Sequence, residues 1–272
     1  MTLQSIPDVV DVCPPRHGGQ GRHWRAVPPR RPGRALRTLL LVAGETLITL
    51  GAVVLLLMAW ELWGTNLAAD SAQRKAVGEF AASLGTSASP QIDPANGYGP
   101  TPVTPKPERT GEVFGVAYVP RFGPEYARPL VEGTAPAQLD TLGLGHYPRT
   151  TMPGAPGNFA LAGHRQTHGA VLDSIDTLVP GDRIYVQTRS GYYVYKVRGS
   201  EIVAPDRVDV LLPVPKKPGT SPSESVLTLT SCNPRYGDWE RFIVYSALDS
   251  WRPIDAGAPT EIAAQVARTM GK

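Results

Sequence analysis

Three side chains suited to nucleophilic and proton-transfer chemistry stand at the ends of short apolar runs. His164 follows FALAG, Cys232 follows VLTLTS, and Arg241 precedes FIVYS. A cysteine thiolate is a nucleophile, histidine carries protons at neutral pH, and arginine stays cationic and can stabilise an oxyanion. Loops at strand ends often carry such residues, so we expect a Cys–His–Arg site. The alternative is structural, because a lone cysteine is commonly a small buried hydrophobe.

A metal site around His164 and His168, with His146 upstream, is a second possibility. The string HRQTH resembles the zinc motif HExxH, but Arg165 stands where a glutamate would act as the base. The segment follows an apolar run and ends at Gly169, so we expect no helix, and without one the two rings lose their alignment. The sequence therefore predicts no metal ligands. It also holds no glycine-rich phosphate loop and no GxSxG string, which leaves no predicted cofactor.

The elements that must position these residues are short β-strands. Residues 112–254 alternate apolar, β-branched or aromatic runs with Gly, Pro and Asn, and the longest runs have period two. A turn at 189–191 separates two of these runs, which indicates a hairpin. We expect one all-β domain, a barrel, with a short helix at 170–178. Residues 255–272 form either an amphipathic helix or, as we favour, a solvated tail.

Glycine and proline fill 28 positions each of the 272, about a fifth of the chain. This content excludes an all-helical bundle, because both residue types interrupt helices. Much of the proline lies in residues 64–111, whose first part, to about 84, can be helical. The remainder is expected to be an extended, semi-rigid extracellular linker. The net charge of +3 gives no reason to expect a nucleic-acid partner.

The N-terminal part predicts a membrane anchor. Residues 1–37 carry seven arginines against two aspartates and indicate a disordered basic cytoplasmic arm. Residues 38–63 are apolar over about the 20 residues needed to span a bilayer, with Glu45 as the one charge in the span 39–60. A buried core helix and a cleaved signal peptide are the alternatives. The basic flank predicts a cytoplasmic N-terminus, which would separate Cys13 from Cys232 and prevent a disulfide between them.

Several of these strings together resemble the sortases. TLTSC at 228–232, Arg241 nine residues later, and GHYPRTTMPGAPGNFALAGHR at 145–165 are similar to sortase signatures over about 113–251, half of the chain. The sequence Cys232-Asn233-Pro234 and the N-terminal anchor resemble class E, which is typical of high-GC Gram-positive bacteria. This resemblance implies an eight-stranded β-barrel preceded by one transmembrane helix. It also implies a single-pass cell-membrane protein with an extracellular catalytic domain.

The resemblance further implies a cysteine transpeptidase. Cys232 would attack the Thr–Gly carbonyl of an LAxTG or LPxTG sorting signal on a surface protein. His164 would protonate the leaving amine and deprotonate the incoming one, and Arg241 would steady the substrate and the oxyanion. A peptidoglycan-precursor amine, of the lipid II type, would resolve the thioacyl enzyme. A pilin-polymerising sortase is disfavoured because no aromatic residue follows Asp93-Pro94 as in a lid, and an inactive binding module is disfavoured by the intact triad.

Candidate substrate contacts follow from the same resemblance. Ser231 stands where sortases usually have threonine, and we expect little effect. His168 stands where class E sortases commonly have a tyrosine associated with preference for LAxTG, so it either changes the preference or acts as an equivalent polar ring. In sortases, the loop corresponding to 203–224 lines the substrate groove. Val208 and Leu211 are therefore candidate contacts for the leucine of the signal.

Overall fold

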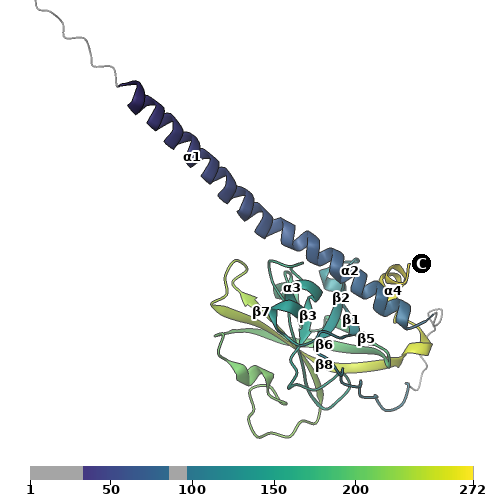
Figure 1. Cartoon of the computed structure of the whole chain (residues 1–272). Helices are drawn as coiled ribbons and strands as arrows, with labels where there is room; N and C mark the ends of the chain where they lie inside the picture. The colour runs from purple at the N-terminus through teal and green to yellow at the C-terminus, as the bar shows by residue number, and fades with distance from the viewer. Residues whose placement is uncertain (1–32, 86–96, 272) are drawn as a thin grey trace, which may run out of the picture. The chain divides into compact units, whose positions relative to one another are not determined.

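The structure is a computed structural model that describes residues 33–85 and 97–271 (Figure 1). The predicted basic arm, apart from its last residues, lies outside the described residues. So do Cys13 and the Asp93-Pro94 dipeptide. The chain divides into two units between Gly51 and Ala52.

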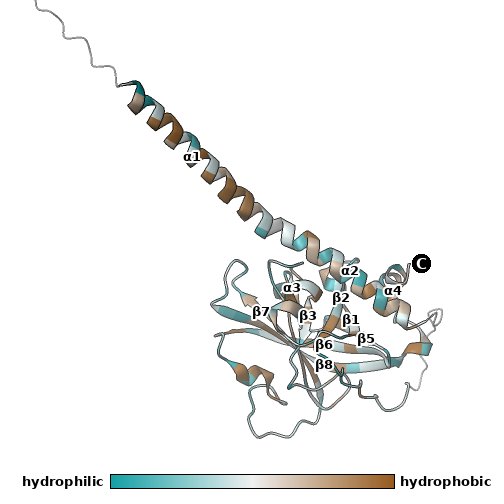
Figure 2. Cartoon of the chain, in the orientation of Figure 1, coloured by the Kyte–Doolittle hydropathy of each residue, from teal (hydrophilic) through white to brown (hydrophobic). Residues whose placement is uncertain are grey.

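The long N-terminal helix α1, Arg34–Ala59, is apolar on all sides. Figure 2 shows its hydrophobic residues, and an 18-residue stretch of it has a mean hydropathy of 2.3. None of that stretch is buried. The hydroxyls of Thr46 and Thr49 donate to the carbonyls of Val42 and Glu45, so neither is left without a partner. At 26 residues the helix is long enough to cross a membrane, and a signal sequence would have the same properties.

Eight strands close into a barrel in the order β1-β2-β3-β4-β7-β8-β6-β5, which confirms the predicted fold. The strands are β1 Val113–Tyr118, β2 Ala127–Glu132, β3 Leu144–His146, β4 Gly157–Ala162, β5 Arg183–Thr188, β6 Gly191–Val203, β7 Ser225–Asn233 and β8 Glu240–Pro253. Neighbouring strands are antiparallel except for the parallel pairs β2–β3 and β4–β7. The predicted hairpin is formed by β5 and β6.

The period of two along each strand divides the barrel into an interior and an outer face. Leu227 and Leu229 of β7, with Phe159 and Leu161 of β4, are fully buried in the central core. Their sequence neighbours therefore point outward. This parity decides the face on which each candidate site residue stands.

Helices cover part of the outer face. They are α2 Thr65–Ser83, α3 Pro136–Leu142 and α4 Ala263–Thr269. The described chain also has a π-helical turn at Trp60–Gly64 and 3₁₀ turns at Pro120–Phe122, Ile175–Thr177, Val208–Leu211, Ile254–Ala256 and Thr260–Ile262. Figure 1 shows α2 beside β1, β2 and α4, all of which it contacts, and it also contacts α3. Where we expected a helix at 170–178, only the single 3₁₀ turn forms. Ala170 has a positive φ of 44°, which a continuous helix does not allow.

The structure differs from the expected solvated tail and the expected spacer. Ile262 and Val266 are buried in a second apolar cluster with Phe80 of α2 and Tyr118 of β1. The first part of the linker is helical, as predicted, but α2 packs on the barrel through its apolar stripe. The described end of the linker, from residue 97, is also docked, since the buried hydroxyl of Thr104 donates to the Tyr193 hydroxyl at 3.0 Å. Burial of these side chains outweighs the extended character that their prolines and polar residues indicate.

Candidate active site

Strand register brings the three candidate catalytic residues together. In the parallel pair β4–β7, Ala162 is the partner of Thr230, so His164 and Cys232 each lie two residues beyond a paired position. The antiparallel pair β7–β8 makes Cys232 the direct partner of Arg241. Neighbouring strands lie about 4.8 Å apart, so all three residues stand side by side at one end of three adjacent strands. Their parity places them on the outer face.

The side chain of Cys232, the candidate nucleophile, is accessible, whereas that of the preceding residue, Ser231, is buried. Cys232 is partly exposed, and its thiol forms no disulfide with any described residue. Ser231 is 3% exposed, and its hydroxyl donates to the Gly163 carbonyl at 2.8 Å. The Ser231 side chain thus holds the end of β4 against β7 on the face opposite Cys232, rather than facing a substrate on the outer face.

His164 is held by a carboxylate that the sequence did not indicate. Its Nε2 lies 2.7 Å from Oδ1 of Asp140, on α3. The same oxygen lies 3.9 Å from Nδ1 of His168, and the two imidazole centroids are 5.2 Å apart. We expected the two rings to diverge without a helix, but the loop after β4 turns back and brings them together. Asp140 is 24 residues upstream on another element, so no local spacing signals its role.

The histidine loop, residues 164–170, is fixed from outside by α2. Asn66 accepts a hydrogen bond from the Gly169 N–H at 2.8 Å, and Gln73 donates to the His168 carbonyl at 3.1 Å. His168 adopts the left-handed conformation, with φ at 55°. Gly169 has φ at 85°, and a Cβ there would lie 2.7 Å from the Gln73 amide nitrogen. The helix expected to be a linker therefore sets the conformation of this loop.

A second layer of residues lies behind the three candidates, on the opposite face of the strands. Arg165, Asn233 and Phe242 each follow one of them in sequence. Arg165 is 4% exposed and donates from Nη1 to Asn233 Oδ1 at 2.5 Å. Its Nη2 lies 2.9 Å from Asp176 Oδ2, and the guanidinium carbon lies 5.6 Å from the Phe242 ring centroid. The sequence marks Arg165 only as the residue that replaces the glutamate of HExxH and gives no sign of this buried role.

Arg241 is held by the connection between β7 and β8. Its Nη1 donates to the carbonyl oxygens of Asp238 at 2.6 Å and of Glu240 at 2.8 Å. The Glu240 carboxylate accepts a hydrogen bond from the Asn233 amide at 2.6 Å. These contacts fix a cation beside Cys232, where it can stabilise negative charge developing on a substrate carbonyl.

The loop after β6 carries Val208 and Leu211, the two predicted contacts for the leucine of the signal, and only one of them is exposed. Val208 is 71% exposed, whereas Leu211 packs against the buried residues Val203, Val210 and Ile243. The Asn158 amide donates to the carbonyls of Val210, at 3.0 Å, and Leu212, at 3.1 Å. The loop is thus anchored on β4, with Val208 open to an approaching peptide and Leu211 largely committed to packing.

Glu201 holds the other end of this loop. Burial alone would raise the pKa of Glu201, but hydrogen bonds from Lys216 and Tyr245 outweigh burial and hold that pKa below its ordinary value. Burial and the bond to Glu201 raise the pKa of the Tyr245 hydroxyl. The ionised carboxylate therefore links the loop to β6 and β8 beside the site.

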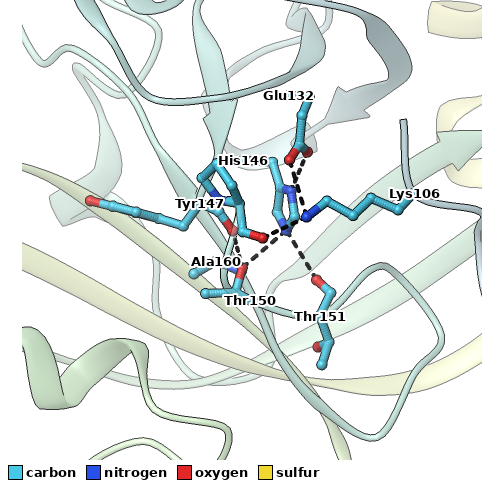
Figure 3. Close-up of polar contacts among 8 residues, drawn as sticks. Lys106, Glu132, His146, Tyr147, Thr150, Thr151 and Ala160 are labelled. Carbon is cyan, nitrogen blue, oxygen red and sulfur yellow. Dashed lines mark hydrogen bonds and ion pairs between the residues drawn. The ribbon is translucent and has the colours of Figure 1, made fainter. Parts of the chain in front are cut away.

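His146 is not part of the site but supports the segment that leads into β4 (Figure 3). It is fully buried, with Nδ1 2.6 Å from Glu132 Oε2 and Nε2 3.0 Å from the Thr150 hydroxyl. The adjacent Tyr147 hydroxyl lies 3.0 Å from that of Thr230 on β7. The buried pair thus fixes the turn that reaches the strand of Cys232.

Comparison with known proteins identifies relatives over most of the chain. Residues 118–249 match the family described as Sortase domain. The sortase SrtE1 of Streptomyces coelicolor is 35% identical over 85% of this chain and 62% of its own length, so this chain spans under two thirds of that relative. SrtE2 of the same organism is 33% identical over 88% of this chain and 90% of its own length.

A solved structure supports the same assignment. The match is the crystal structure of sortase E1 from Streptomyces coelicolor with a tripeptide in the active site. Its TM-score to this chain is 0.52 and its sequence identity is 36%. The match covers 56% of this chain and 97% of that chain. The fold and the sequence similarity over most of the chain agree. The chain therefore belongs to the sortase family and is similar to its class E members.

Proposed function

We propose that this chain is a membrane-anchored cysteine transpeptidase that cleaves an LAxTG- or LPxTG-type sorting signal between Thr and Gly. It transfers the surface protein to the amine of a peptidoglycan precursor. The observation that carries the proposal is the register of β4, β7 and β8, which sets His164, Cys232 and Arg241 on one outer face. The tripeptide in the active site of the related sortase E1 supports a peptide substrate.

The chemistry follows from the positions of these groups. The Cys232 thiolate attacks the threonine carbonyl, and the Arg241 guanidinium stabilises the oxyanion. His164 donates its proton to the departing glycine amine, which leaves a thioester on Cys232 and a neutral imidazole. The incoming amine gives a proton back to His164 as it attacks the thioester. Asp140 accepts a hydrogen bond from His164 Nε2, which leaves Nδ1 for these transfers.

Two residues are placed to influence the choice of signal. His168 has its ring beside that of His164, where a tyrosine is common in class E. Its imidazole is smaller than a phenol and can carry charge, so the proline or alanine position of the signal is the one we expect it to affect. Val208 offers an exposed apolar side chain for the leucine of the signal.

The proposal is tested with the full chain in detergent micelles, fluorogenic LAxTG and LPxTG peptides, and an amine acceptor. Replacing Cys232 by Ala should lower transfer by at least about 1,000-fold, since the nucleophile is lost. The matched control is Cys13→Ser, which should keep full activity. Full activity in Cys232→Ala would overturn the mechanism. Comparing His168→Tyr with wild type on both peptides tests specificity, and equal preferences would remove His168 as a determinant.

We propose an N-terminus inside the cell and a catalytic domain outside, based on the apolar α1 and the basic residues before it. A membrane-impermeant thiol reagent applied to intact protoplasts should label Cys232 and spare Cys13. Labelling of Cys13 alone would reverse the topology. Loss of the first 60 residues from the mature chain would show a signal sequence instead.

A further inference from the structure

The cluster of Asp140, His164 and His168 offers more than a hydrogen-bonded histidine. We propose that these three side chains bind a divalent transition cation, with Zn²⁺ as the best match, and that the bound cation reversibly blocks transfer. The binding part stands on the geometry alone, and the inhibitory part rests on the proposed function.

The donor atoms are close enough to share one cation. One ligand atom from each residue lies within 4.8 Å of the others, and the carboxylate oxygen of Asp140 faces both ring nitrogens, at 2.7 Å and 3.9 Å. Ligand atoms around a tetrahedral zinc with bonds of about 2.1 Å lie about 3.4 Å apart. Closing on a cation therefore needs side-chain movements of about 1 Å. All three side chains are partly exposed, at 28–37%, and have room to move.

The composition of the cluster selects the class of cation. Two imidazole nitrogens and one carboxylate oxygen suit zinc and its neighbours, whereas Ca²⁺ and Mg²⁺ require mostly oxygen ligands. Three protein ligands leave a fourth position for water, as in open zinc sites. The two histidines lie in the loop after β4 and the aspartate lies on α3, so the three ligands come together without the helix of an HExxH motif.

The frame of the site is preorganised by contacts that do not involve the ligand atoms. The left-handed conformation of His168 is held by Gln73 through the His168 carbonyl, and that of Gly169 by Asn66 through its N–H. His164 is fixed by the end of β4, where its own carbonyl accepts the Leu172 N–H at 2.9 Å. The cation therefore does not have to order a loose loop, which lowers the cost of binding.

A cation bound at Nε2 of His164 would stop the proposed proton transfers. A cation on His164 Nε2 takes the lone pair of that nitrogen and displaces the hydrogen bond to Asp140. The ring then keeps its proton on Nδ1 and no longer alternates between imidazolium and imidazole. Neither protonation of the leaving amine nor deprotonation of the incoming one can proceed. Removal of the cation restores the ring.

Binding is measured without using activity. The full chain without a histidine tag, in detergent micelles and with both cysteines replaced (Cys13→Ser, Cys232→Ala), is titrated with Zn²⁺ by calorimetry and with Co²⁺ by visible absorption. We expect one site per chain with a tetrahedral Co²⁺ spectrum, weakened at least about 10-fold by His168→Gln and by Asp140→Asn. Asp206→Asn, an exposed carboxylate elsewhere, is the control and should leave binding unchanged.

Inhibition is measured on the chain with Cys232 intact. Zn²⁺ should inhibit peptide transfer, EDTA should restore it, and Ca²⁺ and Mg²⁺ should have no effect. In His168→Gln the inhibitory Zn²⁺ concentration should rise at least about 10-fold. Equal inhibition of wild type and His168→Gln would place the cation on the thiol instead.

The two proposals fail separately. Absence of Zn²⁺ binding to the thiol-free chain, or equal binding by His168→Gln and Asp140→Asn, would overturn the cation site. Specific binding by a chain that transfers no peptide would leave the site standing and overturn the proposed function. Thermal unfolding of each variant shows whether it is folded before it is titrated.

Discussion

Replacing Arg165 by Met tests whether the layer behind the three site residues positions them. Methionine keeps an unbranched apolar chain of similar reach but removes the guanidinium, which lies over the Phe242 ring, and with it every donor. Oδ1 of Asn233 then loses its donor directly behind Cys232, and the loop that carries His164 loses one of its ties to β7.

The magnitude follows from the burial of each contact. Asn233 is 8% exposed, so loss of a charge-assisted hydrogen bond there costs about 1.5–3 kcal/mol. Asp176 is about half exposed, so its ion pair contributes about 0–1 kcal/mol. The total of about 1.5–4 kcal/mol corresponds to a fall in Tm of about 3–16 °C for a domain of this size. A displacement of about 1 Å at the site would also lower kcat/KM by about 10- to 100-fold.

The assay separates positioning from stability. Transfer is measured well below the Tm of the variant, and the rate of Cys232 alkylation is followed across pH as a second readout of the site. Arg198→Met, which removes an exposed arginine paired with Glu224, is the control and should change neither Tm nor kcat/KM appreciably. An Arg165→Met variant with reduced Tm, wild-type kcat/KM and a wild-type alkylation profile would show a purely structural role. Unchanged Tm would refute the reasoning entirely.

Three further predictions concern the supports of the barrel. Glu132→Leu leaves Nδ1 of the buried His146 without a partner and should lower the free energy of unfolding by about 3–5 kcal/mol; an unchanged Tm would contradict this. Ile262→Ala should cost about 2–4 kcal/mol in urea unfolding, and a loss below about 0.5 kcal/mol would mean that the C-terminal helix is not docked. The hydrogen bond from Arg121 holds the pKa of Asp182 below its ordinary value. The Arg121–Asp182 contact therefore stabilises the fold fully above about pH 4, and this stabilisation is lost as the pH falls through the lowered pKa. Arg121→Gln should therefore lower Tm at about pH 7 and much less at about pH 2; an equal difference at both would refute the sign.

The parts of the fold that could be predicted are those with a local signal. Period-two alternation and turn residues predict the strands and the β5–β6 hairpin, and the apolar run predicts α1. His164, Cys232 and Arg241 could be chosen because each borders a strand. Their proximity depends on which strands pair, and pairing between β4 and β7 joins segments about 70 residues apart.

The missed features are polar or non-local. Asp140 reaches His164 from α3, and no spacing in the sequence links them. The docking of α2 did have a signal, because Ala69, Gln73, Ala76 and Phe80 recur every three or four residues and form its buried stripe. The small size of alanine and the polarity of Gln73 make that stripe a weak signal in the sequence. In the structure, Gln73 is buried and its amide donates to the His168 carbonyl in the histidine loop.

The two layers at the site impose a constraint on the register between β4 and β7. Side chains alternate between faces, so a slip of one residue would turn His164 toward the interior and bring Arg165 to the outer face. Both the proposed chemistry and the buried guanidinium would be lost together. Polar contacts pin the register at three levels along these strands: Thr228 with Asn158, Ser231 with Gly163, and Arg165 with Asn233. Their hydrogen bonds are satisfied only in the native register, so the contacts that stabilise this end of the barrel also select the single pairing that assembles the site.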